Sequence, residues 1–307
     1  MRKYFSLAAV VLSLALSACS LAPQFARPKM DIPDGWSAGS GAMRAGQPDL
    51  PFWKALGSAE LDRLIDAALA RNLDLQAALH RIDEARALAK VAAAPLYPSV
   101  NASGAASRTY QQPQNTNAAS GALSISGEID LWGKNRNQAK AGTYRADASR
   151  YDREALRLVV TADATNFYTQ ILGFNDRIEI AANNLKSDQE ILRIIEARFK
   201  EGAVSGLEVS QQRVEVNGLQ AALAALNQQR TTTLNALAVL LGVAPQKFTA
   251  PNTEFAALKM PEVNLTPPAE LLTARPDIES AEAGLRAANA DIGSARAAFF
   301  PSLTLGL

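Results

Sequence analysis

The sequence has one cysteine and one histidine among its 307 residues. These counts exclude a disulfide framework, and they leave no Cys and His set for a zinc site or for thiol–imidazole catalysis. Aromatic residues make up 6%, and the formal net charge is +1, so no basic surface for nucleic acid is indicated. We therefore expect no catalytic residues, no metal site, no cofactor and no nucleic-acid partner.

Proline is absent between Pro113 and Pro245, which permits long uninterrupted helices. Residues of about 137–242 are predicted to form an antiparallel helical hairpin. Its first helix carries apolar residues at alternating spacings of four and three, a repeat that favours a supercoiled seam: Val160, Ala164, Phe167, Ile171, Phe174, Ile178, Ala181, Leu185, Leu192, Ile195 and Phe199. Only Asp188 interrupts the series. A second series follows in the return helix, with Gln212, Arg230 and Thr233 as its polar members.

A long apolar run of membrane-spanning length is also absent. The run from Leu7 to Leu16 is of signal-peptide length and ends in Leu16-Ser17-Ala18-Cys19, which resembles a bacterial lipobox. We predict a lipoprotein signal peptide at 1–18, with Cys19 as the lipid anchor; an ordinary cleavage site is the alternative. Pro and Gly residues then predict an extended arm at 19–57.

A duplicated segment organises the remaining chain. Ala94–Asn101 reappears as Ala297–Thr304, at an offset of 203 residues, and each copy leads from an Ala-rich helix through an aromatic-Pro-Ser step into a strand. We predict a first structural repeat at 58–250. A connector and the start of a second repeat occupy 251–307, and we expect that second repeat to be truncated at Leu307.

Two strands are predicted in the first repeat, at about 99–107 and 122–132, joined by a polar loop. In the second strand, apolar residues alternate with Ser124, Ser126, Glu128 and Asp130. This alternation suits a transmembrane barrel wall, with lipid outside and water inside, and equally a soluble sheet on a core. Ser20, directly after the lipobox cysteine, resembles the residue found there in lipoproteins sent to the outer membrane, and this address favours the barrel. We expect the four polar residues to face the lumen, although Glu128 and Asp130 are also placed to cap the following helix.

Five motifs together carry a resemblance to a known family. They are Leu16–Cys19, Gly127-Glu-Ile-Asp-Leu-Trp-Gly133, Phe199-Lys-Glu-Gly-Ala-Val-Ser205, Leu237-Ala-Val-Leu-Leu-Gly242, and Arg275-Pro-Asp-Ile278 running to Ala295-Arg-Ala-Ala-Phe-Phe-Pro-Ser302. In this order they resemble the TolC-like outer-membrane efflux proteins, most closely the lipidated NodT-like branch that serves resistance–nodulation–division pumps.

The resemblance implies a mainly α-helical fold with transmembrane β-strands. Long antiparallel helical hairpins would form a periplasmic tunnel, and a homotrimer would share one outer-membrane barrel, with one and a fraction of the two repeats present here. The hairpin tip, Gly202, Ala203, Val204 and Ser205, would meet a periplasmic adaptor or serve simply as a turn. The implied function is passive efflux of small molecules supplied by an inner-membrane pump, from a lipid-anchored position in the outer membrane of a Gram-negative bacterium. The gate residues of the family would lie in the second hairpin, beyond this sequence.

Three other functions compete with this one. A coiled-coil lipoprotein scaffold without a pore would share the helices and the anchor, but it would not need the alternating strand. A non-functional truncated fragment of the channel would share every motif. A cell-wall enzyme would need a paired acid and base in a pocket, and no such pair is visible in the sequence.

Overall fold

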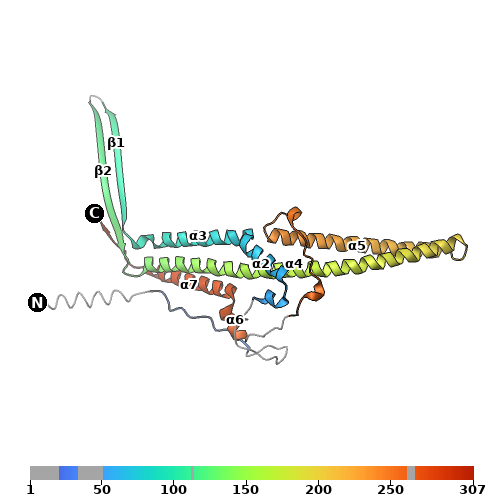
Figure 1. Ribbon diagram of the computed structural model, residues 1–307. Helices are drawn as coiled ribbons and strands as arrows, with labels where there is room; N and C mark the ends of the chain where they lie inside the picture. Colours follow the sequence, from blue (N-terminus) through green and yellow to red (C-terminus); the bar gives the residue numbers. More distant parts are fainter. Residues whose placement is uncertain (1–20, 34–50, 112–113, 261–266) are drawn as a thin grey trace. The chain divides into compact units, whose positions relative to one another are not determined.

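The computed structural model describes residues 21–33, 51–111, 114–260 and 267–307 (Figure 1). The chain divides into two compact units, which are described separately. Unit 1 comprises Met1–Asp34, Ala78–Glu154 and Pro268–Leu307, and unit 2 comprises Gly35–Ala77 and Ala155–Pro267. The elements, in chain order, are η1 (Phe52–Leu56), α2 (Ala59–Arg71), α3 (Leu73–Ala93), η2 (Ala94–Leu96), β1 (Ser99–Gln111), β2 (Gln114–Ile129), α4 (Lys134–Lys200), α5 (Gly206–Leu240), η3 (Pro245–Lys247), η4 (Phe255–Ala257), α6 (Pro268–Ala274), α7 (Pro276–Ala297) and β3 (Leu303–Gly306).

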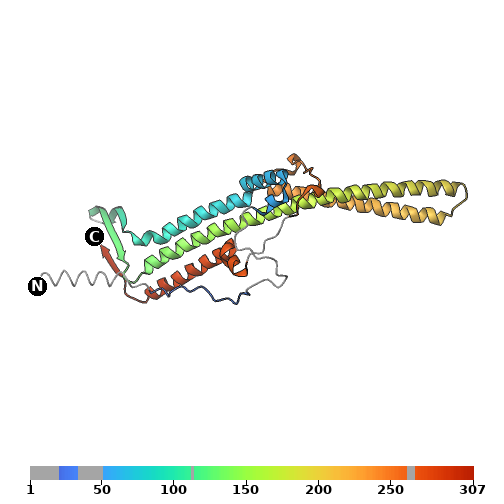
Figure 2. The ribbon, with the colours of Figure 1, turned by 60° about the horizontal axis from the view of Figure 1, so that its bottom comes forward.

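Unit 1 contains three helical segments that run side by side, from α3, the first part of α4, and α7 (Figures 1 and 2). Small residues allow this close packing. Gly142 of α4 is buried, and a Cβ placed there would lie 3.0 Å from the backbone of Ala89 in α3. The side of α7 that carries Ala283, Ala287 and Ala290 is also buried. Gly and Ala at these positions thus let the helix backbones approach closely.

The sheet of unit 1 has the order β1-β2-β3, with both pairs antiparallel. The β1–β2 register runs from Ser99 opposite Ser126 to Gln111 opposite Gln114, so the two strands form one long hairpin. The predicted loop at 108–121 is therefore wrong, because residues 108–111 and 114–121 belong to the strands. The loop was inferred from a lack of apolar alternation. Backbone pairing needs no such alternation, because it joins N–H and C=O groups whatever side chains the residues carry.

The end of the second strand also differs from the prediction. β2 ends at Ile129, not at residue 132. Leu131 and Trp132 lie in the turn before α4, where Gly133 adopts φ 76°. A left-handed backbone is accessible to Gly at little cost, and it ends the strand before the helix begins.

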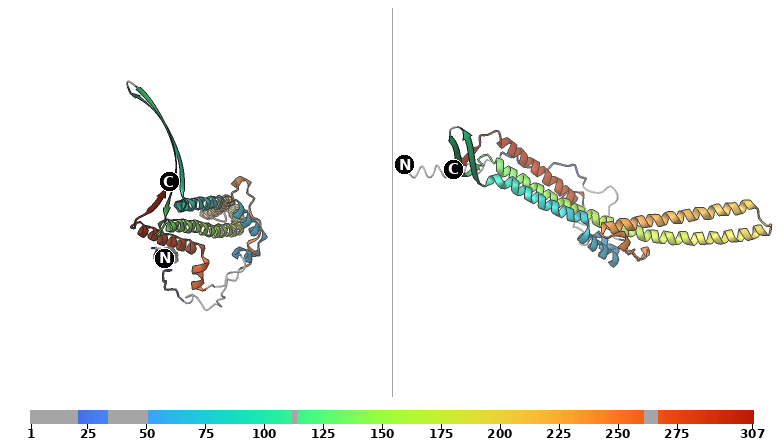
Figure 3. Two further views of the ribbon diagram at one scale, coloured as in Figure 1. Left: turned by 90° about the vertical axis from the view of Figure 1, so that its left-hand side faces the viewer. Right: turned by 90° about the horizontal axis from the view of Figure 1, so that it is seen from above.

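Unit 2 contains the second part of α4 and its antiparallel partner α5, which Figure 3 shows side by side up to the connecting turn. Every predicted seam residue of α4 from Val160 to Ile195 is buried or half-buried. The interrupting residue, Asp188, accepts a hydrogen bond at 2.9 Å from Nε2 of Gln212, one of the polar residues in the α5 series. The two sequence irregularities are therefore partners across the hairpin.

The core of unit 2 lies where α2 packs against α4 and the end of α5. Ser58 caps α2 by accepting the backbone N–H of Leu61 with its hydroxyl. The Ser58 hydroxyl also lies 2.8 Å from the hydroxyl of Tyr168, which is fully buried. The buried core residues are Leu61, Ile65, Ala68, Leu75, Val160, Ala164, Tyr168, Ile171, Leu172, Leu237 and Leu241.

A glycine with positive φ lies in the chain just before α5, and another lies just after it. Gly202, in the turn that precedes it, has φ 76°, and a Cβ at this position would meet nothing within 4 Å. Gly242, just after the helix, has φ 67° and lies against the carbonyl oxygen of Arg71. Asn72 joins the same junction by donating to the carbonyl of Leu240 at 2.9 Å and accepting the N–H of Leu75. In the described part of the chain, no helix is long and apolar enough to cross a membrane.

Candidate functional site: strand wall and hairpin tip

The sheet of unit 1 has one face rich in hydroxyl and amide groups. The predicted lumen residues Ser124 and Ser126 lie opposite Asn101 and Ser99, and the Ser99 and Ser126 hydroxyls are 3.0 Å apart. Glu128 lies opposite Thr304 of β3. Since residues that pair in a sheet share a face, the polar side chains of three strands form one continuous surface.

The opposite face is apolar and bare. It carries Val100, Leu123, Ile125, Ile129, Leu303 and Leu305. Leu123 is 68% exposed and Leu305 is 60% exposed, although side chains of this kind are usually buried. Farther along the same face, the Arg108 guanidinium lies 4.9 Å from the centre of the Tyr110 ring. An apolar band with an Arg–Tyr pair beyond it suits a lipid-facing wall with its polar boundary.

Asp130 does not continue the polar face of β2. Its carboxylate accepts the backbone N–H groups of Asn135 and Arg136, at 3.2 and 2.8 Å, and it also pairs with the Arg136 side chain. An acidic group at this place satisfies free N–H groups and complements the dipole of α4. The capping alternative thus describes Asp130. Glu128 stays in the strand, 3.8 Å from the ammonium group of Lys134.

Trp132 was not singled out as a site residue, yet it joins the two repeats at the base of the sheet. Its ring stacks on Phe300 with the centroids 4.7 Å apart, and its indole N–H donates to the carbonyl of Pro301 at 2.9 Å. Phe300 belongs to the second copy of the duplicated segment, and its counterpart in the first copy, Tyr97, is 72% exposed. The duplication itself was the signal that could have marked this contact.

The predicted tip residues form the turn between α4 and α5. The N–H groups of Gly202 and Ala203 donate to the carbonyls of Phe199 and Arg198, and Glu208 accepts the N–H of Ser205. Gly202, Ala203 and Ser205 are exposed, and Val204 is half-buried. Leu207 beside them is 66% exposed. The tip is therefore a well-bonded, uncharged turn with apolar surface next to it, which is suited to contact with another protein.

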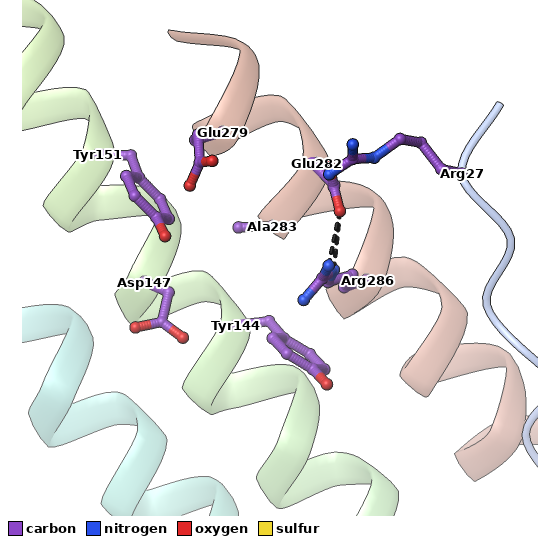
Figure 4. Close-up of a pocket in the computed structure, with 8 residues that line it drawn as sticks. All are labelled: Arg27, Tyr144, Asp147, Tyr151, Glu279, Glu282, Ala283 and Arg286. Atoms are coloured by element: carbon purple, nitrogen blue, oxygen red, sulfur yellow. Dashed lines mark hydrogen bonds and ion pairs between the residues drawn. The ribbon is translucent and has the colours of Figure 1, made fainter. Parts of the chain in front are cut away.

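A cavity of about 100 Å³ lies between α4, α7 and the arm at 21–33 (Figure 4). Tyr144, Asp147 and Tyr151 line it from α4, opposite Glu279, Glu282 and Arg286 of α7. The neighbouring Glu279 carboxylate raises the pKa of Tyr151. Among the residues that the structure describes, no group of three or more His, Cys, Asp and Glu side chains is arranged to hold a metal ion. The predicted lipobox residues Leu16, Ser17, Ala18 and Cys19 lie outside the described residues.

Comparison with known sequences identifies similar proteins over nearly the whole chain. A family model described as outer membrane efflux protein matches residues 64–243 and 268–307. The chain is 38% identical over 311 residues to the pyoverdine export outer membrane protein OpmQ of Pseudomonas putida, covering 96% of this chain and 66% of that protein. It is 32% identical to the outer membrane protein OprJ of Pseudomonas aeruginosa, covering 98% of this chain and 65% of that protein.

Comparison of structures gives the same picture. The CmeC outer membrane channel of Campylobacter jejuni matches with a TM-score of 0.82 and 26% identity, covering 94% of this chain and 64% of that one. The chain thus spans slightly less than two thirds of the length of these proteins.

Proposed function

Because the chain belongs to the outer membrane efflux protein family, we propose that it is a channel subunit through which an efflux system passes small molecules out of the cell. The family confirms the predicted outer-membrane location, and the solved relatives confirm the predicted fold class of helical tunnel and barrel strands. Members of the family are transport proteins. We assign this chain no enzymatic activity and no cofactor.

The two-faced sheet is the observation that carries this proposal. The sheet has one exposed apolar face and one hydroxylated face. Both faces are well solvated when the sheet lies in a membrane wall, with lipid against the apolar face and water against the hydroxylated one. On β1 the apolar band runs from Val100 to Ala106, before Arg108. At about 3.3 Å per residue the six steps from Val100 to Ala106 span about 20 Å along the strand, and the tilt of roughly 35–45° found in outer-membrane barrels turns this into about 14–16 Å of depth within an apolar band of roughly 25 Å.

The remaining parts of the assembly follow from the family. We propose a homotrimer, whose subunits close the barrel between them, since an open sheet edge in lipid leaves backbone groups unpaired. A periplasmic adaptor would contact the tip at Gly202–Ser205, and a resistance–nodulation–division-type inner-membrane pump would supply the cargo and the energy. Lipid attached to Cys19 would anchor the arm, and Ser124, Ser126 and Glu128 would line the exit path.

Reconstitution in planar lipid bilayers tests the proposal. Protein taken from outer-membrane fractions should give stepwise conductance. Ser124→Trp on the polar face should reduce the conductance, because the ring would occupy the water-filled path. Leu123→Trp is the matched control, since the neighbouring residue points to the other face and the ring would lie in lipid.

Two results would count against the proposal. A membrane-inserted oligomer without conductance would favour the lipoprotein scaffold instead. Equal conductance losses in the two Trp variants would mean that the faces are assigned wrongly.

A further inference from the structure

The described part of the N-terminal arm, residues 21–33, runs beside α7 within unit 1 (Figures 1 and 2). Four residues of the arm meet four residues of the helix. Ala22 lies against Gly293, the carbonyl of Pro23 accepts a hydrogen bond from Asn289, the Phe25 ring lies 5.3 Å from the Arg286 guanidinium, and Arg27 pairs with Glu282. The arm and the helix therefore run in opposite directions.

The contacts on α7 follow a single stripe, because 282, 286, 289 and 293 are spaced by four, three and four. The stripe is about 16.5 Å long at 1.5 Å per helical residue. The arm from Ala22 to Arg27 spans about 16.5 Å at 3.3 Å per extended residue. The stripe on α7 and the arm segment from Ala22 to Arg27 therefore have equal lengths, so each contact can form without distortion of the others.

Each contact uses a different property of the helix. A Cβ at Gly293 would lie 2.5 Å from the Cβ of Ala22, so the arm fits only against a residue without a side chain. The side-chain amide of Asn289 donates a hydrogen bond at 2.8 Å to the carbonyl of Pro23. Glu282 is shared, with one oxygen 2.6 Å from Arg27 and the other 2.6 Å from Arg286; Figure 4 shows the three side chains together. Along α7, from its C-terminal end, the arm thus meets the space left by Gly293, the donor of Asn289, the cation of Arg286 and the anion of Glu282.

The internal duplication provides a comparison within the same chain. At the offset of 203 residues, the stripe corresponds to Leu79, Asp83, Arg86 and Lys90 of α3. All four are exposed, and Asp83 pairs with Arg86 instead of with another element. Lys90 stands where Gly293 leaves this space, and Asp83 stands where Arg286 covers the aromatic ring. The first repeat therefore lacks the site, and the arm-binding stripe is specific to the second.

We propose that Ala22–Arg27 is a docking strap, and that the stripe Glu282, Arg286, Asn289 and Gly293 is its binding site. Pro23 and Pro28 restrict the backbone of the arm, which lowers the entropy lost when it docks. The predicted acylation residue, Cys19, precedes the strap by three residues, so docking ties the anchored end of the chain to α7. This role is independent of conduction.

Limited chymotrypsin digestion of the purified protein tests the strap, with the fragment that ends at Phe25 measured by mass spectrometry. Cleavage needs the undocked arm, so its rate reports the open fraction. Gly293→Ala should raise the rate at Phe25 by about tenfold or more. Gly284→Ala, in the same helix with nothing near its Cβ position, should leave it within about twofold.

A second pair of variants tests the strap without changing Gly293, and so without altering the packing of α4 against α7. Arg27→Glu places a like charge against Glu282 and should raise the rate at Phe25 several-fold. Lys29→Glu makes the same change of charge two residues farther along the arm and should not. The strap is refuted if both members of each pair are cleaved at equal rates. It is also refuted if the parent chain is cleaved as fast as a free peptide of residues 21–33. A docked arm in a chain without conductance would overturn the proposed function alone.

Discussion

Gly202 and Gly242 provide a matched pair for testing the junction of α2 with α5. Both have positive φ, 76° and 67°, so an Ala at either position suffers the same backbone penalty of about 1–2 kcal/mol. Their surroundings differ. Nothing lies within 4 Å of a Cβ at Gly202, whereas a Cβ at Gly242 would lie 2.7 Å from the carbonyl oxygen of Arg71. That oxygen belongs to the backbone and cannot move without shifting the end of α2.

The expected cost of Gly242→Ala is therefore the backbone penalty plus about 1–3 kcal/mol for the overpacked contact. The free energy of unfolding, from denaturant titration followed by helical circular dichroism, should fall by about 2–5 kcal/mol, compared with about 1–2 kcal/mol for Gly202→Ala. Gly218→Ala in the middle of α5 has open space and a helical backbone, so it should stabilise by about 0.5–1 kcal/mol. Equal losses for Gly202→Ala and Gly242→Ala would refute the idea that contact with α2 adds to the cost.

Three further predictions concern single contacts. Asn72→Ala should lower the unfolding free energy by about 1–3 kcal/mol, because it leaves a buried N–H and a carbonyl without their partners; a loss below about 0.5 kcal/mol would contradict this role. Burial alone would raise the pKa of Glu60, but hydrogen bonds from Thr253, Asn252 and Tyr168 lower it below its ordinary value. Stability from this group is thus present above the unfolded pKa of about 4.3 and is lost as pH falls through the lower folded pKa, and Glu60→Gln should remove that part of the acid sensitivity in pH-dependent denaturation. Phe300→Ala should speed amide exchange in β3, whereas Tyr97→Ala, at the exposed counterpart in the first repeat, should not.

Much of the helical architecture could be predicted from the sequence, because it depends on local periodicity. The spacing of Val160 to Ile195 marks residues that are buried or half-buried in the structure, and Gly202 with Ser205 marks the turn. Asp188 was visible as an interruption. Its partner, Gln212, became identifiable only once the register of α4 against α5 was known.

The strands and the site were less accessible to sequence analysis, because their signals depend on distant partners. Residues 108–111 and 114–121 pair through the backbone, which leaves little trace in side-chain pattern. Asp130 had two possible roles, and the choice depends on where β2 stops. No residue pattern in the arm predicted where it binds on α7. Its partner, Gly293, looks like an ordinary helical glycine until the approach of Ala22 is seen.

The place of β2 in the middle of the sheet has a consequence for the order in which the chain folds. Its pairing with β1 joins two strands that follow one another closely in the chain, a contact that forms early and locally. Its pairing with β3 joins Ser126 to Gly306, 180 residues later in the chain. During synthesis, the β3-facing edge of β2 therefore stays unpaired while α4, α5 and α7 are made. Over that interval the backbone groups of β2 at Ser126–Ile129, which β3 pairs in the folded chain, are open to other chains, and unpaired strand edges of this kind promote aggregation.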